Sequence, residues 1–228
     1  MARLTGQELD RYRDKFEDPE YAARYASASS GKTLTLPPPG LGGVIGRLVS
    51  ILESRAVGRL LLLVPPGGVL LDAPCGFGKL SNVGRSRFRT LGVDASLPLL
   101  LMYRSRESAE GVRADLRSLP LRDQSVKSIV CHRFLHRASP QLRSQILEEL
   151  RRVASEYLIV YYSIPSRVHR IVTAMEKSVL RRERGRIYTT DVPRAGAELE
   201  MGPWRIVKRG SVARWISTGQ LFLLARDG

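Results

Sequence analysis

The 228-residue chain is 43% hydrophobic and carries a formal net charge of +15, a composition typical of one soluble globular domain with a substantial core. Its apolar runs, such as residues 60–64, are far too short to span a membrane, and its acidic first residues do not resemble a secretion signal. The two cysteines, Cys75 and Cys131, lie far apart and form no metal-binding spacing. We therefore expect a cytoplasmic protein without a bound metal ion.

The positive charge favours an anionic partner, such as nucleic acid, a phosphate group or a membrane surface. Arginine accounts for 31 of the 37 basic residues, so an arginine-rich composition without any binding role is the alternative explanation. Charge alone leaves both interpretations open.

Residues 1–43 are predicted to form an N-terminal helical extension. Two short helices are expected, over residues 6–16 and 19–27, and the runs at 27–31 and 37–40 are typical of loops. Aromatic residues recur every four or five positions at Tyr12, Phe16, Tyr21 and Tyr25. Such a stripe either packs on the domain or forms a lid over a bound ligand.

Residues 44–228 are predicted to form the main domain, beginning with a helix over residues 44–63 that ends before two prolines. Residues 69–72 then form a short apolar run, typical of a buried parallel strand. A tight turn with Gly76 and Gly78 follows, where the missing Cβ atoms let the backbone approach a ligand. A helix over residues 79–85 would point its free N–H groups at the same place.

Strands and helices alternate through the rest of the domain. Further strands are expected at residues 90–94, 111–116, 128–131 and 157–162, with helices at 96–106, 140–153, 165–184 and 191–199. The last two strands, at 204–209 and 220–225, have no helix between them and should pair antiparallel. The predicted fold class is α/β, a doubly wound, mostly parallel sheet of seven strands with an N-terminal helical lid.

Three of the predicted strands carry an acid at the carboxyl end: Asp72, Asp94 and Asp115. Ligands of open α/β sheets bind outside these strand ends. Asp94 follows Asp72 by 22 residues, the spacing at which an acid binds ribose hydroxyls in nucleotide-binding folds. A nucleoside offers hydroxyl and amine donors, which carboxylates accept, so we expect a nucleoside-type ligand here.

An ordered set of motifs resembles the class I S-adenosylmethionine-dependent methyltransferases, especially the type 11 group. Residues 71–78 resemble the first motif of that family, residues 92–96 the second, and residues 114–116 with 119–123 the third. Two residues depart from the pattern. Pro74 stands where the family commonly has glycine, and Lys127 stands where many relatives carry an acid.

The resemblance implies S-adenosyl-L-methionine as cofactor and methyl transfer as the reaction. The acid at the second strand would hold the ribose and the acid after the third would meet the adenine amine. The implied cofactor-binding residues are Asp72, Ala73, Gly76, Gly78, Asp94, Ala95, Asp115, Leu116 and His132.

The methyl-transfer site itself carries weaker signals. In the resemblance, residues 130–136 border that site, which makes His136 a candidate base or substrate contact, and Tyr161 a second candidate at the end of the fifth strand. His132 and His136 are four residues apart, but no third metal ligand lies near them in sequence. An insertion at residues 164–190 with a basic face is expected to shape the acceptor site.

We therefore predict methyl transfer to an oxygen, nitrogen or carbon nucleophile. The acceptor would be a small molecule or lipid, and the net charge favours an anionic one. The alternatives are an RNA methyltransferase and a catalytically silent binding module with the same fold. The intact acids Asp72, Asp94 and Asp115 argue against the silent module, which would have no need of them.

Overall fold

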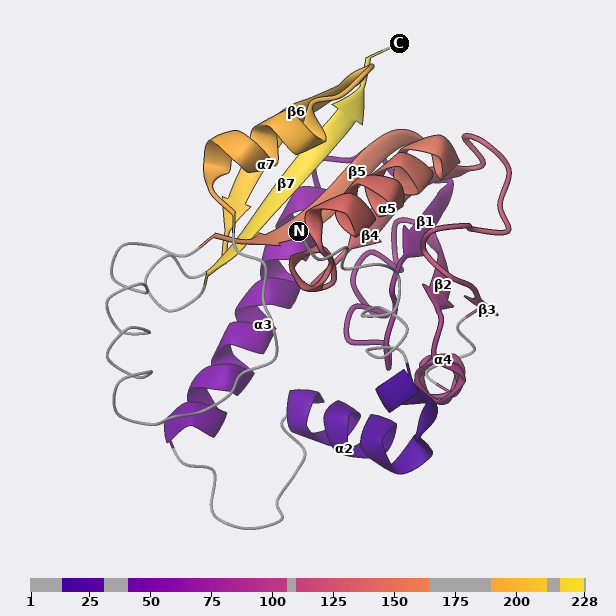
Figure 1. Ribbon diagram of the computed structural model, residues 1–228, viewed down its shortest axis with the longest axis vertical. Coiled ribbons are helices and arrows are strands. Elements are labelled where there is room, and N and C mark those ends of the chain that lie inside the picture. The colour runs from indigo at the N-terminus through magenta and orange to yellow at the C-terminus, as the bar shows by residue number, and fades with distance from the viewer. Residues whose placement is uncertain (1–13, 31–40, 106–109, 165–189, 213–217, 228) are drawn as a thin grey trace.

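The computed structural model describes residues 14–30, 41–105, 110–164, 190–212 and 218–227. A seven-stranded sheet with the strand order β3-β2-β1-β4-β5-β7-β6 runs through its centre, and helices lie against both faces (Figure 1). The doubly wound α/β fold predicted from the sequence is therefore confirmed. Among the described residues, no helix has the length and apolar character needed to cross a membrane.

Five neighbouring strands are parallel, and the sheet ends in an antiparallel pair, as predicted from the missing helix between them. The parallel strands are β1 (Val69–Asp72), β2 (Arg89–Asp94), β3 (Glu110–Arg113), β4 (Val126–Cys131) and β5 (Ala154–Ser163). The last two strands are β6 (Trp204–Ser211) and β7 (Gly219–Arg226), and β7 lies between β5 and β6.

The helices cover the sheet in two layers. On one face, α5 (Pro140–Val153) and α7 (Val192–Leu199) pack over a core that includes Leu71, Ile129 and Leu158. On the other face, α3 (Leu41–Leu61) packs over Leu70, Val130 and Ile159, and α4 (Leu97–Arg104) packs beside it on β2 and β3. Successive strand residues therefore point into different cores, which explains why the buried strands are apolar throughout. The N-terminal helix α2 (Pro19–Ser30) packs on α3 and α4.

Three helices begin with a capping side chain followed within two residues by proline. Ser96, Ser139 and Asp191 each accept a hydrogen bond from the backbone N–H three residues later. Each bond satisfies one of the free backbone N–H groups at a helix start.

The helix predicted over residues 79–85 is wrong: this segment forms successive turns. Gly78 has a φ of +86°, which lies outside the helical region. The following N–H groups bond three residues back, from Ser81 to Gly78 and from Val83 to Leu80, and the Ser81 hydroxyl also bonds the Gly78 carbonyl. Local side-chain bonds of this kind compete with a regular helix.

Other boundaries differ by smaller amounts. The third strand ends at Arg113, so Asp115 lies in the following loop, where it forms an isolated bridge with Ser118. Residues 27–30, predicted as the start of a loop, continue helix α2. The predicted helix at residues 165–184, and nearly all of the insertion at 164–190, lies outside the described residues.

Gly92 in β2 lets α4 approach the sheet closely. A Cβ atom at this position would lie 2.4 Å from the ring of the fully buried Tyr103. We expect Gly92→Ala to lower the free energy of unfolding by about 1–3 kcal/mol, because the ring and helix must move. Gly196→Ala in α7 is the matched control, since no atom lies within 4 Å of its Cβ position and alanine favours helix. Equal denaturation midpoints for the two variants would contradict this account.

Candidate functional site

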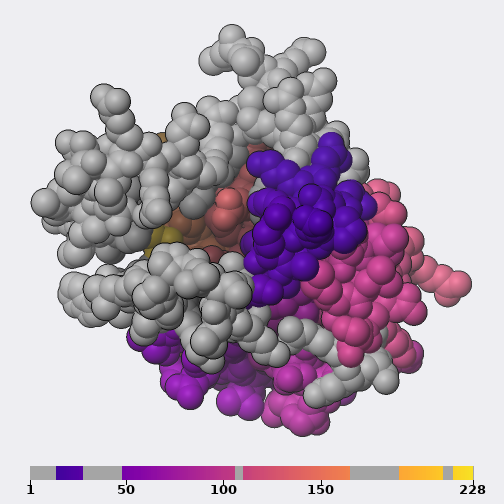
Figure 2. Space-filling view, turned by 90° about the horizontal axis from the view of Figure 1, so that it is seen from below, coloured from indigo at the N-terminus to yellow at the C-terminus, as the bar shows by residue number. Residues whose placement is uncertain are grey.

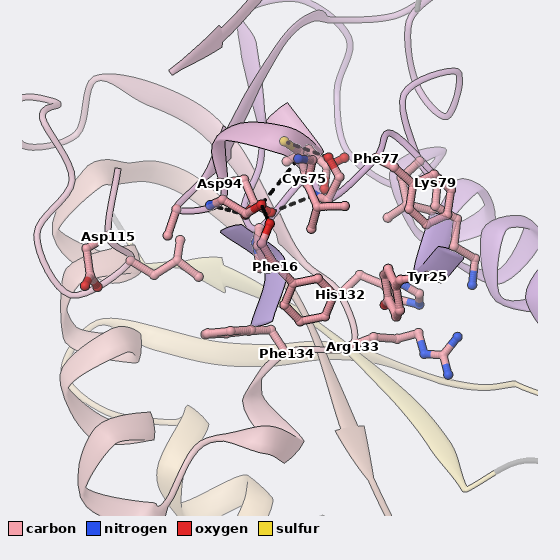
Figure 3. A pocket seen from close by; sticks show the side chains of 18 residues that line it. Phe16, Tyr25, Cys75, Phe77, Lys79, Asp94, Asp115, His132, Arg133 and Phe134 are labelled. Atoms are coloured by element: carbon pink, nitrogen blue, oxygen red, sulfur yellow. Dashed lines mark hydrogen bonds between the residues drawn. The ribbon is translucent and has the colours of Figure 1, made fainter. Parts of the chain in front are cut away.

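A pocket opens beyond the carboxyl ends of β1, β2 and β4 and contains about 1060 Å³ of space, part of it open solvent. Its walls combine three acids, two cations and several aromatic rings (Figure 3). The lining residues are Phe16, Tyr25, Asp72, Pro74, Cys75, Gly76, Phe77, Lys79, Leu80, Asp94, Ala95, Ser96, Leu99, Asp115, Leu116, His132, Arg133 and Phe134.

The turn after β1 is tied to both neighbouring strands. The Ala73 N–H donates to the Val130 carbonyl at 3.0 Å, and the Cys75 N–H donates to the Val93 carbonyl at 2.8 Å. Gly76 has a φ of +53°, a conformation that side chains disfavour. The sequence therefore folds into a narrow turn whose backbone forms the floor of the pocket.

Asp94, at the end of β2, connects this turn to the start of α4. Its Oδ2 accepts the Gly76 N–H at 2.8 Å, and its Oδ1 accepts the Ser96 N–H at 2.9 Å. Burial raises the pKa of Asp94 above its ordinary value, while these two backbone bonds oppose the rise. Each carboxylate oxygen has two acceptor sites, so Asp94 can still accept hydrogen bonds from a ligand.

Asp72, at the end of β1, is only 7% exposed, and its Oδ2 has no hydrogen-bond partner among the described residues. Burial, with a further contribution from the charge of Asp94, raises the pKa of Asp72 from 3.8 to about 8. A buried acceptor without a partner is costly in a folded protein. Asp72 is therefore suited to a ligand that brings its own donor or positive charge.

Asp115, beyond β3, is held by Arg117. The Arg117 guanidinium donates to both carboxylate oxygens at 2.5–3.0 Å, and its backbone N–H donates to Oδ1 at 2.9 Å. Leu116 and Phe134 add apolar surface to the pocket wall. This combination suits a flat ring with a polar edge, such as an adenine base.

Four charged or polar side chains meet on the opposite side, and we call them the Glu53 group. Glu53 extends from α3 with a side chain only 1% exposed, and its Oε2 lies 2.6 Å from Lys79 Nζ. The same oxygen lies 3.5 Å from Arg133 Nη1 and 3.8 Å from His132 Nε2. Burial, together with the Lys79 and Arg133 charges, keeps the pKa of His132 well below its ordinary range, so this imidazole is neutral.

His136 and Tyr161, the two candidate catalytic residues, lie outside the pocket lining. The Tyr161 ring packs edge-on between His132 and His136, with centroids 5.2 and 5.4 Å apart. Burial lowers the pKa of His136 to about 3, so it is a weak base at neutral pH. No group of three His, Cys, Asp or Glu side chains suited to a metal ion occurs in the part of the chain that the structure describes.

The N-terminal segment contributes an aromatic cover. Phe16 and Tyr25 line the pocket together with Phe77 from the turn, and the Phe16–Tyr25 ring centroids are 4.9 Å apart. The Ser96 hydroxyl donates to the Phe16 carbonyl at 2.7 Å, and Arg113 pairs with Glu17 at 3.0 Å. Figure 2 shows this indigo segment lying against the pink middle part of the chain.

Most residues predicted to bind a cofactor line this one pocket: Asp72, Gly76, Asp94, Ala95, Asp115, Leu116 and His132. Ala73 and Gly78 shape the turn but do not line it. Sequence reasoning placed Arg133 and Phe134 in a segment that borders the methyl-transfer site but gave them no role, and it missed the lining role of Lys79 and the place of Glu53 behind it. One signal for Glu53 was available, because it is the single acid in the sequence of α3.

Comparisons with known proteins agree with this geometry. A family model described as a methyltransferase domain matches residues 71–157. A tRNA (carboxymethyluridine(34)-5-O)-methyltransferase from Arabidopsis thaliana is 36% identical over 98 residues, which are 42% of this chain and 24% of that protein. The match therefore spans about a quarter of the length of this curated relative.

Solved structures with the same fold cover nearly the whole chain. Magnesium protoporphyrin IX methyltransferase from Synechocystis PCC 6803, solved with bound SAH, has a TM-score of 0.77 at 16% identity and covers 96% of this chain and 100% of its own. The PH0226 protein from Pyrococcus horikoshii OT3 has a TM-score of 0.65 at 19% identity. The aligned residues cover 91% of this chain and 99% of the PH0226 structure. The sequence match therefore identifies a methyltransferase domain over residues 71–157, and the solved structures share the fold of nearly the whole chain.

Proposed function

We propose that the chain transfers a methyl group from S-adenosylmethionine to an oxygen, nitrogen or carbon nucleophile of an anionic small-molecule or lipid acceptor. The observation that carries the proposal is the meeting of Asp72, Asp94 and Asp115 in one pocket at the carboxyl ends of the strands. The cofactor, when bound, supplies an electrophilic methyl group on a positively charged sulfur.

The residues of the pocket fit this cofactor. Asp94 can accept the ribose hydroxyls, and Asp115 can accept the adenine amine beside the apolar Leu116 and Phe134. The Asp72 oxygen that lacks a partner offers an acceptor to the ammonium group. The ribose, the adenine amine and the ammonium group of an adenosyl amino acid can thus each meet a complementary carboxylate.

The contribution of the protein to the reaction would be alignment and exclusion of water. His132 is neutral and a poor base, and its buried Nε2 has no hydrogen-bond partner among the described residues. The sulfonium is already a good methyl donor, so placing the nucleophile in line with it can supply much of the rate enhancement. The aromatic cover of Phe16, Tyr25 and Phe77 would keep water away from the reacting atoms.

We extend the proposal to the N-terminal segment, which would act as a lid. Chymotrypsin cleavage at the exposed Tyr21 and Tyr25 should be slowed several-fold by S-adenosylhomocysteine, because a filled pocket holds the segment in place. Phe16→Ala should lose most of this protection, since Phe16 contacts both Tyr21 and Tyr25. Equal cleavage rates with and without the ligand in the unmodified protein would contradict the lid.

RNA is the second candidate acceptor, and a specific observation favours it. The curated relative with 36% identity over 98 residues is a tRNA methyltransferase, and this chain carries a net charge of +15. An RNA-binding enzyme should shift RNA in a native gel, with an affinity that falls steeply with salt. An enzyme for a small molecule or lipid should show no such salt-dependent shift at comparable concentrations.

Titration calorimetry with S-adenosylmethionine and S-adenosylhomocysteine tests the shared part of both candidates. A labelled-methyl screen over RNA, lipid and small-molecule pools then identifies the acceptor class. Binding of both ligands and transfer into one pool are expected. A folded chain that binds neither ligand would contradict the proposal and favour the catalytically silent module.

A further inference from the structure

The outward face of α3 carries large apolar side chains, although this helix lies at the outside of the molecule (Figure 1). Leu48 and Ile51 are 45% and 44% exposed, and Leu62 and Leu63, directly after the helix, are 63% and 56% exposed. The opposite face of the same helix packs into the core through Val57 and its neighbours. Apolar side chains gathered on an exposed helix face commonly mark an interaction site.

Basic side chains lie between the two apolar ends of this face. Arg55 and Arg59 follow Ile51 at four-residue intervals, so the helical repeat places all three side chains on one stripe. Both arginines are exposed, and neither forms an ion pair with another residue that the structure describes. Glu53, the single acid in the sequence of α3, is buried on another side of the helix, where it contacts Lys79. The outward stripe is therefore positive, and α3 adds no negative charge to it.

A third cation adjoins this stripe at the edge of the sheet. Lys208 in β6 pairs with Leu223, which belongs to the core beneath α3, so Lys208 lies on the α3 side of the sheet. A Cβ atom at Gly210, two residues further along β6, would lie 3.8 Å from the Leu60 side chain of α3. Lys208 is exposed and has no ion pair within the described parts of the chain. Two elements thus bring positive charge to one surface.

We propose that this surface, which we call the α3 surface, docks on a membrane whose lipids carry anionic headgroups. Its members are Leu48, Ile51, Arg55, Arg59, Leu62, Leu63 and Lys208. Helices that lie on membranes combine apolar side chains, which enter the boundary between headgroups and acyl chains, with Lys or Arg, which contact anionic lipids. The α3 surface has both parts, and its apolar side chains extend over about 20 Å along the helix axis.

RNA and a second copy of the chain are the competing occupants. The phosphates of RNA would contact the arginines but would leave the apolar side chains at both ends of the stripe in water. A second copy would bring two positive surfaces together, which like-charge repulsion opposes. The inference goes beyond the proposed function and does not depend on it, because no member of the α3 surface lines the cofactor pocket.

Vesicle flotation with the full chain tests the docking. Vesicles of phosphatidylcholine with about one-third phosphatidylserine should bind the unmodified protein, and the binding should weaken as the salt concentration rises. Vesicles of phosphatidylcholine alone should bind about tenfold more weakly or less, because they carry no net charge. If the unmodified protein does not bind the anionic vesicles at low salt, the proposal is overturned.

Arg55→Gln with Arg59→Gln should weaken binding to the anionic vesicles about tenfold or more, because each cation near such a surface adds to the attraction. Arg55→Lys with Arg59→Lys keeps both charges and should keep most of the binding. Arg122→Gln with Arg194→Gln is the matched control, since both arginines are exposed and neither belongs to the α3 surface. Thermal unfolding should be nearly the same for all of these variants, because every substituted side chain is exposed.

Leu62→Gln with Leu63→Gln should also weaken vesicle binding about tenfold or more, because less apolar area then leaves water at the membrane. Met201→Gln, at a 48% exposed residue just after α7, should leave the binding unchanged. Equal vesicle binding by the α3-surface variants and their controls would overturn the proposal. An RNA gel shift that the arginine variant loses while it keeps vesicle binding would assign the surface to RNA instead. A dimer in sedimentation that the leucine variant loses while it keeps vesicle binding would assign it to a second copy.

Discussion

Asp94→Asn is expected to weaken S-adenosylhomocysteine binding by about tenfold or more, equivalent to roughly 1.5–3 kcal/mol for a lost charge-assisted hydrogen-bond pair. Asp94 is buried at the end of β2 and lines the pocket, and its carboxylate retains acceptor sites for two ribose hydroxyls. The asparagine side chain has nearly the same shape but no charge and only one acceptor oxygen. Titration calorimetry measures the loss directly.

A second ligand separates ribose binding from damage to the turn. Asp94 also accepts the Gly76 N–H, so the variant can disturb the pocket floor. With the 2′-deoxy analogue of S-adenosylhomocysteine, the loss caused by Asp94→Asn should shrink severalfold, because one hydroxyl partner is already missing. An equal loss for both ligands would mean that Asp94 acts only through the turn. Asp123→Asn, at a surface acid paired with Arg152, should leave both affinities unchanged.

The sequence predicted the sheet and its acids well because both depend on local patterns. Short apolar runs that each end at or near an acid determine where β1 and β2 stop, and the parallel order brings Asp72 and Asp94 together. The antiparallel end of the sheet followed from the missing helix between β6 and β7. These features require no knowledge of distant contacts.

The sequence could not reveal features that depend on contacts between distant residues. Glu53 meets Lys79 26 positions later and Arg133 80 positions later, so the Glu53 group exists only after folding. The turns at residues 79–85 depend on the positive φ of Gly78. The spacing of apolar residues, on which the helix prediction rested, carries no information about that backbone conformation. The pairing of Asp115 with Arg117 is local, but it needs a bent backbone that an extended strand over residues 111–116 would not provide.

Asp72 is expected to make cofactor binding depend on pH. Its raised pKa of about 8 means that the carboxyl group is mostly protonated at pH 7 in the free protein. The ammonium and sulfonium charges of the cofactor favour the ionised carboxylate, so binding near pH 7 should release up to one proton. Affinity should then rise by as much as tenfold per pH unit between about pH 6 and 8, and level off above the pKa.

The two cysteines and the tyrosine near Asp72 do not titrate in this range. Burial raises the pKa values of Cys75, Cys131 and Tyr103 above their ordinary values, so all three stay protonated at pH 8. Asp72→Asn should therefore remove most of the proton release while leaving the turn in place.

The raised pKa of Asp72 also predicts how the stability of the ligand-free protein depends on pH. Asp72 has a higher pKa folded than unfolded, so the folded state binds more protons between about pH 4 and 8. Relative to alkaline pH, proton binding by Asp72 adds to the free energy of unfolding. This gain is fully present below the unfolded pKa of 3.8 and is lost as the pH rises to about 8. Asp72→Asn carries no titrating group, so at pH 9 it should unfold several degrees above the unmodified protein, and the difference should narrow toward pH 5.

Calorimetry in phosphate and in Tris at pH 7 measures the proton release, because the two buffers differ in ionisation enthalpy. The unmodified protein should give different apparent binding enthalpies in the two buffers, and Asp72→Asn should give nearly equal ones. Thermal unfolding of both proteins from pH 5 to 9 provides the independent stability measurement. If the binding enthalpy of the unmodified protein does not depend on the buffer, Asp72 is already ionised before the cofactor binds, and its partnerless oxygen needs another explanation.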